Sequence, residues 1–511
     1  MNDVTKDPKI FGHPVGLYIC ALTEMWERFS FYGMKFLLLL YLTKYHFFTD
    51  ADGLDVLGSY AGLVYALPLI GGMLADRFLG MRKAVIYGGI LLCLGHFGMA
   101  FEGNQATETA NGVIVRDTAA IQVFYLSLAL IVVGVGFLKP NISTIVGRLY
   151  TEEDPARDSG FTIFYMGINL GSFLATILCG WLGETYGWRY GFGLAGIGMF
   201  FGLLVFIWGQ KFLFGHAEPS NPAVLKEKKA GVTVENLIYL GGLVGVFIVW
   251  SVIQRHFWVV TIMSITAACF GGWLIYYLIA RCNRVQARRM IVLSVLTLST
   301  VVFWALFEQS AASMTQYADR VVDRTVGSFE ITASQTGSFN AGFIILLAIP
   351  FAAIWVWLAK KGWEPSTPVK FGLGIIQAGL GFGALVIGAS MPDEAGKIAM
   401  GWLTLAYFLH TTGELCLSPV GLSAVTKLAV PNVVGLMMGA WFLATAFSEK
   451  LATTVSKFAD VKTSGGEVTD ISQALVEYTD LFTFLAWMGI GVGVFMLIIS
   501  PLLKKGMHGI H

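Results

Sequence analysis

Four ionisable side chains lie on one face of an otherwise apolar segment near the N-terminus. The segment TEMWERFSFYGMK contains Glu24, Glu27, Arg28 and Lys35. In a helix these four residues and Tyr32 fall within an arc of about 140°. An ionised side chain at mid-bilayer costs at least about 2.5–3.5 kcal/mol, so this face must contact water or charged partners rather than lipid.

Carboxylates on such a face can couple proton movement to a conformational change. Burial favours the protonated carboxyl group, whereas a nearby cation favours the carboxylate. A glutamate that gains or loses a cationic partner when helices move would take up a proton in one state and release it in the other. The alternative is a buried ion-pair cluster that only fixes helix packing. The candidates for proton coupling on this segment are Glu24 and Glu27 with their neighbour Arg28. Two further candidates, Glu308 and Glu414, lie within later apolar segments.

The composition predicts an all-α polytopic membrane protein. Of the 511 residues, 56% are hydrophobic and 13% are charged, whereas a soluble domain carries about 25% charged residues. Apolar stretches of about 20 residues, long enough to cross a bilayer, recur along the chain. We predict fourteen transmembrane helices, at residues 15–43, 54–76, 84–101, 120–147, 160–183, 191–213, 235–254, 257–280, 290–317, 337–360, 370–390, 397–427, 433–458 and 478–503.

Several functional classes do not fit this sequence. The net charge of +1 argues against nucleic acid as a partner, and the six cysteines are scattered without a CxxC pair. We therefore expect neither disulfide bonds nor a metal site. No HExxH or GxSxG motif occurs, so we expect no enzymatic activity, and the balanced charges argue against an ion channel. We expect no cofactor, with protons as the coupling ion.

The distribution of basic residues predicts the topology. Lysine and arginine are about twice as frequent in the loops on the N-terminal side as in the opposite loops. The positive-inside rule then places both termini in the cytoplasm of a protein of the cell (inner) membrane. Arg28, Lys35 and Lys139 lie deep within predicted spans and need partners, whereas Lys450 lies near a helix end and is expected to extend to the interface. His96 and His410 are expected to be packing residues.

Two six-helix halves are predicted, with an insertion between them. A polar stretch at 215–234 follows the sixth span, and two further spans precede the basic RCNRVQARR loop. We expect an N-terminal six-helix bundle at 1–214, a cytoplasmic linker with two inserted transmembrane helices at 215–289, and a C-terminal six-helix bundle at 290–511. The inserted pair carries no charge within the membrane, so we assign it no transport chemistry.

The loop between the second and third spans, GGMLADRFLGMRK, resembles the signature of the major facilitator superfamily. The pattern is a glycine, an Asp-Arg pair, a second glycine and an Arg-Lys pair. The acidic residue can meet a helix N-terminus or a basic partner, and the basic residues can hold the cytoplasmic face. We expect a conformational role for Gly72, Asp76, Arg77, Gly80, Arg82 and Lys83.

Five further motifs resemble the bacterial-type proton-coupled oligopeptide transporter (POT/PTR) family of this superfamily. They are TEMWERFSFYG, GVGFLKPNISTIVGRLY, FTIFYMGINLGS, FWALFEQ and GELCLSPVGLSAVTK, which follow one another in the order of the family. The resemblance covers nearly the whole chain. It implies two six-helix bundles with two inserted helices, and proton-driven symport of di- and tripeptides by alternating access.

The resemblance also implies how a peptide would bind between the bundles. The N-terminal half supplies Lys35 and Lys139 for the peptide carboxylate, and the C-terminal half supplies Glu308 and Glu414 for its ammonium group. Lys139 is a natural partner for a carboxylate in the opposite half, and the resemblance suggests that Glu414 fills that role, in a pair that opens on the cytoplasmic side. The substrate-binding residues implied by the resemblance are Tyr32, Lys35, Tyr65, Lys139, Asn169, Trp304, Glu308, Asn340, Glu414, Ser418 and Trp441.

The chain departs from the family pattern at two positions. In the family the position of Lys35 is often arginine and the position of Phe31 is often tyrosine. This chain therefore lacks a bidentate guanidinium at the first position and a hydroxyl group at the second. The second span contains no histidine, so proton handling should depend on carboxylates. The alternative function is that of a relative carrying nitrate, another small anion or a peptide-like drug. We expect a monomer in the lipid bilayer, with di- and tripeptides and protons as its ligands.

Overall fold

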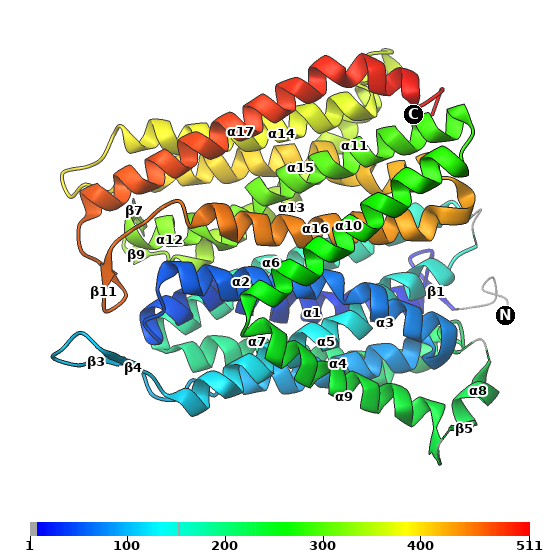
Figure 1. The fold of residues 1–511 in the computed structure, drawn as a ribbon, viewed down its shortest axis with the longest axis horizontal. Coiled ribbons are helices and arrows are strands. Elements are labelled where there is room, and N and C mark those ends of the chain that lie inside the picture. The colour runs from blue at the N-terminus through cyan, green and yellow to red at the C-terminus, as the bar shows by residue number, and fades with distance from the viewer. Residues whose placement is uncertain (1–7, 152–153, 220, 230, 511) are drawn as a thin grey trace. The chain divides into compact units, whose positions relative to one another are not determined.

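The computed structural model describes residues 8–151, 154–219, 221–229 and 231–510. Long α-helices dominate these residues, and the strands form pairs of two residues each (Figure 1). The contacts divide the chain into two compact units. The first consists of Met1–Phe47 and Leu63–Arg255, and the second of Phe48–Gly62 and His256–His511. The boundary after Arg255 lies between the two inserted helices. The first inserted helix therefore belongs to the first unit, and the second inserted helix belongs to the second unit.

The first unit is built around one central helix, α1. Its second half is almost entirely buried, and it packs against α6 and α7 and also meets α5. Glycines allow close contacts between helices, since a Cβ atom on Gly171 would lie 2.1 Å from the carbonyl oxygen of Met25. The elements are β1 (Lys9–Ile10), β2 (His13–Pro14), α1 (Val15–Leu40), η2 (Tyr41–Tyr45), α3 (Pro68–Leu74), η3 (Ala75–Leu79), α4 (Met81–Met99), β3 (Thr107–Glu108), β4 (Ile114–Val115), α5 (Thr118–Arg148), α6 (Ala156–Tyr186), α7 (Trp188–Gly209), η4 (Gln210–Leu213), α8 (Pro222–Lys226), β5 (Lys228–Lys229), β6 (Val232–Thr233) and α9 (Val234–Ile253).

The second unit has its closest helix pair in α14 and α17, which run side by side (Figure 1). A Cβ atom on Gly489 would lie 2.6 Å from the Cα atom of Gly379, so the two backbones nearly touch. The elements are α10 (His256–Ala280), α11 (Arg284–Phe307), η5 (Glu308–Ala311), α12 (Ser313–Arg320), β7 (Val322–Asp323), β8 (Thr325–Val326), β9 (Phe329–Glu330), η6 (Ser334–Gly337), α13 (Ser338–Lys360), α14 (Thr367–Ala389), β10 (Ile398–Ala399), α15 (Met400–Leu428), η7 (Pro431–Val433), α16 (Val434–Ser456), β11 (Thr463–Ser464), β12 (Glu467–Val468) and α17 (Ile471–Gly506). The strand pairs are antiparallel except for β7 with β10.

Helix α2 (Asp50–Ala66) has its first part in the second unit and its last residues in the first. Arg320 donates to both carboxylate oxygens of Asp50, at 2.6 and 2.7 Å, and to the hydroxyl of Tyr478 at 2.9 Å. Asp55, one turn further along α2, accepts from Lys450 at 2.8 Å. These two ion pairs hold the start of α2 against the helices of its unit.

The expectation that Lys450 extends to the interface is wrong. Its side chain is largely buried and lies 2.8 Å from Asp55, which also lies 2.6 Å from Lys457. Sequence spacing could not reveal the partner, because Asp55 and Lys450 are 395 residues apart. A carboxylate within reach neutralises the ammonium group, and extension to the interface is then unnecessary.

The predicted spans coincide with helices throughout the chain. Among the described residues, eleven helical segments are long and apolar enough to cross a membrane. The three remaining predicted spans are occupied by α1, α4 and α15, so the structure is consistent with fourteen transmembrane helices. His96 and His410 are buried as packing residues, and the Nε2 atom of His410 lies 3.0 Å from the carbonyl oxygen of Ala378.

Candidate functional site

The charged face of α1 forms a buried ion-pair cluster. Arg28 donates from Nε and Nη2 to the two carboxylate oxygens of Glu27, with Nη2 to Oε1 at 2.5 Å. Its Nε atom lies farther from Glu24, at 3.6 Å from Oε1. All three residues are at most 2% exposed. Arg28 therefore neutralises Glu27 closely and Glu24 loosely, and Oε2 of Glu24 has no hydrogen-bond partner within the described part of the chain.

Two further cations of the first unit belong to the same region. Lys35 is 2% exposed on α1, and both Lys35 and Arg28 lie over the ring of Phe31. The ring centroid lies 4.7 Å from the guanidinium carbon and 5.8 Å from the ammonium nitrogen. Lys139, from α5, interacts electrostatically with Glu24 and with Lys35. Three cations and two carboxylates of the described residues thus interact in this region.

The aromatic residues expected in this region contact the cations. Lys139 lies over the ring of Tyr65, with its ammonium nitrogen 4.5 Å from the centroid, and the Arg28 guanidinium lies 5.9 Å from the ring of Tyr32. Such contacts stabilise a cation without removing its charge. Pro140 follows Lys139 inside α5 and removes one backbone hydrogen bond of that helix. Asn169 on α6 is buried and donates to the carbonyl of Tyr165 at 3.0 Å.

The second unit contains a buried carboxylate held by an amide. Glu414, on α15, is 7% exposed, and its Oε2 atom accepts from Asn340 Nδ2 at 3.0 Å. The same amide donates to the hydroxyl of Thr411, also at 3.0 Å. Glu308 follows the last residue of α11 and interacts electrostatically with Glu414. The structure brings Asn340 and Glu414 together as polar neighbours, and Thr411, one turn before Glu414, was missed by sequence reasoning.

The other expected residues of the second unit have packing partners. Trp304 on α11 contacts Phe307 edge-to-face at a centroid distance of 5.2 Å. Trp441 on α16 is 7% exposed, and its ring covers Gly421, where a Cβ atom would lie 2.5 Å away. Ser418 is half-buried, one turn after Glu414 on α15. For Trp441 the structure shows a packing contact, so a ligand contact stays a prediction.

The residues of the superfamily signature join the first unit to the polar linker. Asp76 has the basic partner expected, since its Oδ1 atom lies 3.7 Å from Nη2 of Arg148. Arg82 pairs with Glu218, and Lys83 lies 2.7 Å from Glu235 in the first turn of α9. Arg77 lies over the ring of the adjacent Phe78, and a Cβ atom on Gly72 of α3 would lie 3.4 Å from Pro140 of α5.

Gly80 ends η3 with φ +78° and directly precedes α4. A Cβ atom there would lie 2.6 Å from the backbone nitrogen of Pro219. We expect Gly80→Ala to lower the free energy of unfolding by about 1–3 kcal/mol, because both the backbone conformation and the contact are unfavourable. Thermal unfolding in detergent measures this. Gly231→Ala is the matched control, with φ +82° but open space around it; equal losses in the two variants would contradict a role for the contact with Pro219.

Comparison with known proteins decides the family. The model of the POT family matches residues 82–471. The chain belongs to the POT family. The peptide transporter YePEPT of Yersinia enterocolitica is 37% identical over 470 residues, which cover 86% of this chain and 87% of the relative. The di-/tripeptide transporter of Lactococcus lactis subsp. cremoris is 33% identical over 528 residues, covering 99% of each chain.

A solved structure agrees over the same length. A mutant of the peptide transporter POT in complex with alafosfalin has a TM-score of 0.81 and 34% identity, with 100% of both chains covered. The family and its major facilitator fold, predicted from the motifs, are thus confirmed. The chain is a multi-pass membrane protein of a transporter family. Among the described residues, no group of three or more His, Cys, Asp or Glu side chains could hold a metal ion.

Proposed function

We propose that this member of the POT family is a proton-driven symporter that imports di- and tripeptides by alternating access. The observation that carries the proposal is the charge of the two buried clusters. In the first unit Arg28, Lys35 and Lys139 lie with Glu24 and Glu27, and in the second Glu414 accepts from Asn340 and lies beside Glu308. The cations of the first unit suit the carboxylate of a peptide, and the carboxylates of the second suit its ammonium group.

Glu24 and Glu414 are the carboxylates we assign to proton binding. A carboxylate in a tight ion pair stays ionised, whereas one with neutral or distant partners exchanges a proton more readily. Arg28 donates to both oxygens of Glu27, so we do not assign proton binding to Glu27. Glu24 and Glu414 are in the second situation, with a cation at 3.6 Å and an amide donor at 3.0 Å respectively. We assign Glu27 and Arg28 to holding Glu24 in place, and Glu308 to modulating Glu414.

Recognition of peptides through their ends explains a broad substrate range. Lysines are point charges with rotatable donors, so Lys35 and Lys139 can follow the carboxylate of peptides of different length. Asn340 can reorient between Glu414, Thr411 and the peptide backbone, since its amide carries two donors. The aromatic side chains Tyr32, Tyr65, Trp304 and Trp441, with Asn169 and Ser418, are proposed to line the space for the side chains of the peptide.

One proton suffices to drive uptake. Moving one elementary charge through 100 mV yields about 2.3 kcal/mol. Because 1.4 kcal/mol is a factor of ten, one proton sustains a roughly fifty-fold gradient of a neutral substrate. A pH difference adds to this. We propose that the proton is the coupling ion and that the transporter needs no other cofactor.

The proposal also covers the orientation of the protein in the membrane, its oligomeric state and the parts of the chain that move during transport. We place both termini in the cytoplasm of the inner membrane, as the basic loops predict, and we propose that the monomer is the transporting unit. The halves at 1–214 and 290–511 would rock against each other, with 215–289 as an insertion outside the transport path. The signature residues Arg82 and Lys83 would then restrain the linker through Glu218 and Glu235.

A liposome assay tests the substrate class. Purified protein is reconstituted with an imposed pH gradient and membrane potential, and uptake of labelled dialanine, trialanine and nitrate is compared. We expect gradient-driven uptake of both peptides, abolished by a protonophore, and none of nitrate. The alternative is a carrier of nitrate or another small anion. The cations of the first unit would suit such an anion, but the Asn340–Glu414 pair would then have no ligand. Uptake of nitrate without peptide would reject peptide transport.

A further inference from the structure

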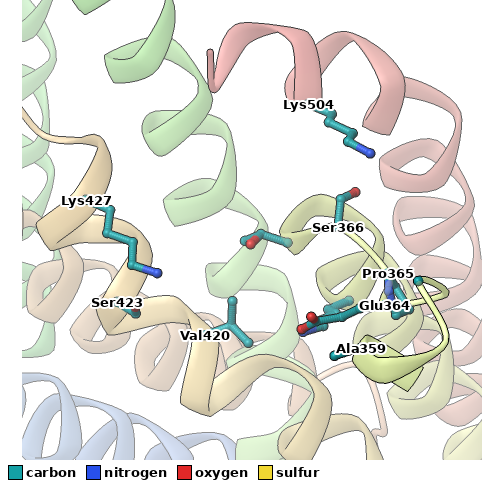
Figure 2. Close-up of a pocket in the computed structure, with 11 residues that line it drawn as sticks. Ala359, Glu364, Pro365, Ser366, Val420, Ser423, Lys427 and Lys504 are labelled. Atoms are coloured by element: carbon teal, nitrogen blue, oxygen red, sulfur yellow. The ribbon is translucent and has the colours of Figure 1, made fainter. Parts of the chain in front are cut away.

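Two pockets of about 580 Å³ each differ in their lining. The pocket of the second unit contains carboxylate, hydroxyl and ammonium groups, among them those of Glu364, Ser366 and Lys504 (Figure 2). The pocket of the first unit lies between α3, α5 and α9, and we call it the α9 pocket. Among its lining residues that the structure describes, Lys229 is the one charged residue, and the others are apolar or glycine. The proposed transport chemistry uses none of the residues that line the α9 pocket.

Glycines give the α9 pocket its space. A Cβ atom on Gly71 of α3 would lie 2.0 Å from the carbonyl oxygen of Gly136 on α5, so these two helices touch beside the pocket. On α9, a Cβ atom on Gly241 or Gly245 would meet nothing within 4 Å. Both glycines line the pocket, so a larger side chain at either position would extend into it.

Polar contacts hold α9 in place beside the pocket. Glu235, in the first turn of α9, lies 2.7 Å from Lys83 of α4 and accepts from the hydroxyl of Tyr239 at 3.1 Å. The hydroxyl of Tyr87 on α4 donates to the carbonyl of Tyr239 at 2.8 Å. A Cβ atom on Gly242 would lie 2.4 Å from the same Tyr87 hydroxyl, so α9 packs directly on this tyrosine. These contacts fix one wall of the pocket, and a preformed wall lowers the cost of ordering on binding.

The α9 pocket is long enough for a lipid chain. Its lining residues on α9 run from Val234 to Val249, about 22 Å along the axis at 1.5 Å per residue. One leaflet of a bilayer has a hydrocarbon depth of about 15 Å, half of the usual 30 Å. A helix of about 10 Å diameter and 22 Å length would occupy roughly three times the volume of the pocket. The pocket therefore suits one extended chain and is too small for a helix of a second copy.

Lys229 places a positive charge at one end of the α9 pocket. It lies in β5, five residues before α9 begins at Val234. Since α9 is long and apolar enough to cross a membrane, a residue just before it lies at headgroup level. Glu235 pairs with Lys83, and no ion pair of Lys229 occurs within the described part of the chain. An apolar pocket with a cation at its headgroup end is complementary to a lipid with an acyl chain and an anionic head.

We propose that the α9 pocket binds one acyl chain of an anionic phospholipid, with the phosphate of the headgroup on Lys229. The inserted helix α9 is then a lipid-binding element of the first unit. A bound lipid contacts α3, α5 and α9 together and stabilises the folded first unit by mass action. Gly241 and Gly245 also have the G-x-x-x-G spacing at which membrane helices pair, so a second copy of this chain is the competing occupant. The proposal does not depend on the transported substrate.

Lipid binding to the full-length protein tests the proposal. Phosphatidylglycerol and phosphatidylcholine are titrated separately onto the purified protein, and the first bound lipid is followed by native mass spectrometry. We expect phosphatidylglycerol to bind more tightly than phosphatidylcholine. Lys229→Gln should weaken phosphatidylglycerol binding about five-fold, the contribution of one lysine near an anionic headgroup. Gly245→Leu should weaken the binding of both lipids about fifteen-fold, because leucine displaces about two methylene groups of the chain from the pocket.

Each variant has a matched control outside the pocket. Lys228→Gln removes the neighbouring exposed lysine, and Gly272→Leu adds leucine at an exposed glycine of α10 that also has open space around it. Both controls should bind phosphatidylglycerol as tightly as the wild type does. A phosphatidylglycerol with a photoactivatable group in its acyl chain gives a second readout. We expect it to label peptides of α3, α5 and α9, and to lose this labelling in Gly245→Leu.

Equal phosphatidylglycerol affinity in the wild type, Lys229→Gln and Gly245→Leu would overturn the proposal. So would an equal loss in the two controls, or labelling confined to other helices. Phosphatidylcholine bound as tightly as phosphatidylglycerol would overturn the assignment of the headgroup to Lys229. A dimer that Gly245→Leu dissociates, without lipid labelling of α9, would assign the pocket to a second copy instead. A rise in melting temperature with phosphatidylglycerol, absent in Gly245→Leu, confirms binding to the folded protein.

Discussion

Replacing Glu414 with glutamine is expected to abolish proton-driven uptake of dialanine. Glutamine keeps the shape of the side chain and can still accept the hydrogen bond from Asn340, so the local structure should persist. It cannot take up or release a proton, and the membrane potential then no longer drives accumulation. The accumulation ratio should fall from about fifty-fold at 100 mV to one. Uptake into liposomes with an imposed pH gradient and potential measures this.

A matched substitution and a second assay support the interpretation of Glu414→Gln. Glu330→Gln makes the same chemical change at a 66% exposed carboxylate of the same unit and should leave uptake unchanged. Peptide counterflow, which needs no net proton movement, separates the two roles of Glu414. Counterflow at normal affinity indicates a purely proton-binding carboxylate, and a weakened affinity indicates contact with the peptide ammonium group. Gradient-driven uptake at the wild-type level in Glu414→Gln would refute its assignment to proton coupling.

The second large effect is expected from Arg28→Gln, which removes the cation from the cluster on α1. Glu27 is 0% exposed, and Arg28 binds both of its oxygens. Removing one partner of a buried ion pair typically costs about 3–5 kcal/mol, because the other charge stays buried. The melting temperature of Arg28→Gln should therefore lie well below that of the wild type.

Thermal unfolding in detergent between about pH 5 and pH 8, the range in which most proteins are most stable, checks the prediction for Arg28→Gln. The double variant Glu27→Gln, Arg28→Gln should regain most of the stability, because no unpaired charge is then buried. Arg189→Gln, which removes a largely exposed arginine 3.9 Å from Glu102, should leave the melting temperature unchanged. A melting temperature of Arg28→Gln equal to that of the wild type would show that the ion pair is not what stabilises the helix.

Sequence reasoning was most accurate where the information is local. The arc of charged residues on α1 follows from helical periodicity alone, and the structure has all of these charges buried on one helix. The spans follow from hydrophobic length, and the family from motifs that keep their order. The closer pairing of Arg28 with Glu27 than with Glu24 depended on side-chain rotamers, which periodicity does not specify.

Contacts between distant segments could not be predicted from spacing. Asn340 and Glu414 are 74 residues apart, and Thr411 joins them only because α13 packs against α15. The ion pairs of Asp50 with Arg320 and of Asp55 with Lys450 assign the start of α2 to the second unit. Nothing in the apolar pattern of α2 indicates this, because a membrane helix can be apolar against lipid or against either neighbour.

The residue pattern indicates a helical membrane transporter of the POT family and shows which side chains carry charge into the bilayer. Which charges are paired tightly, as Glu27 is, and which are held loosely, as Glu24 and Glu414 are, depends on the folded structure. The physical reason is that the cost of burying a charge is set by the chemistry of the side chain. Its compensation is set by atoms that approach within about 4 Å, and only folding brings those together.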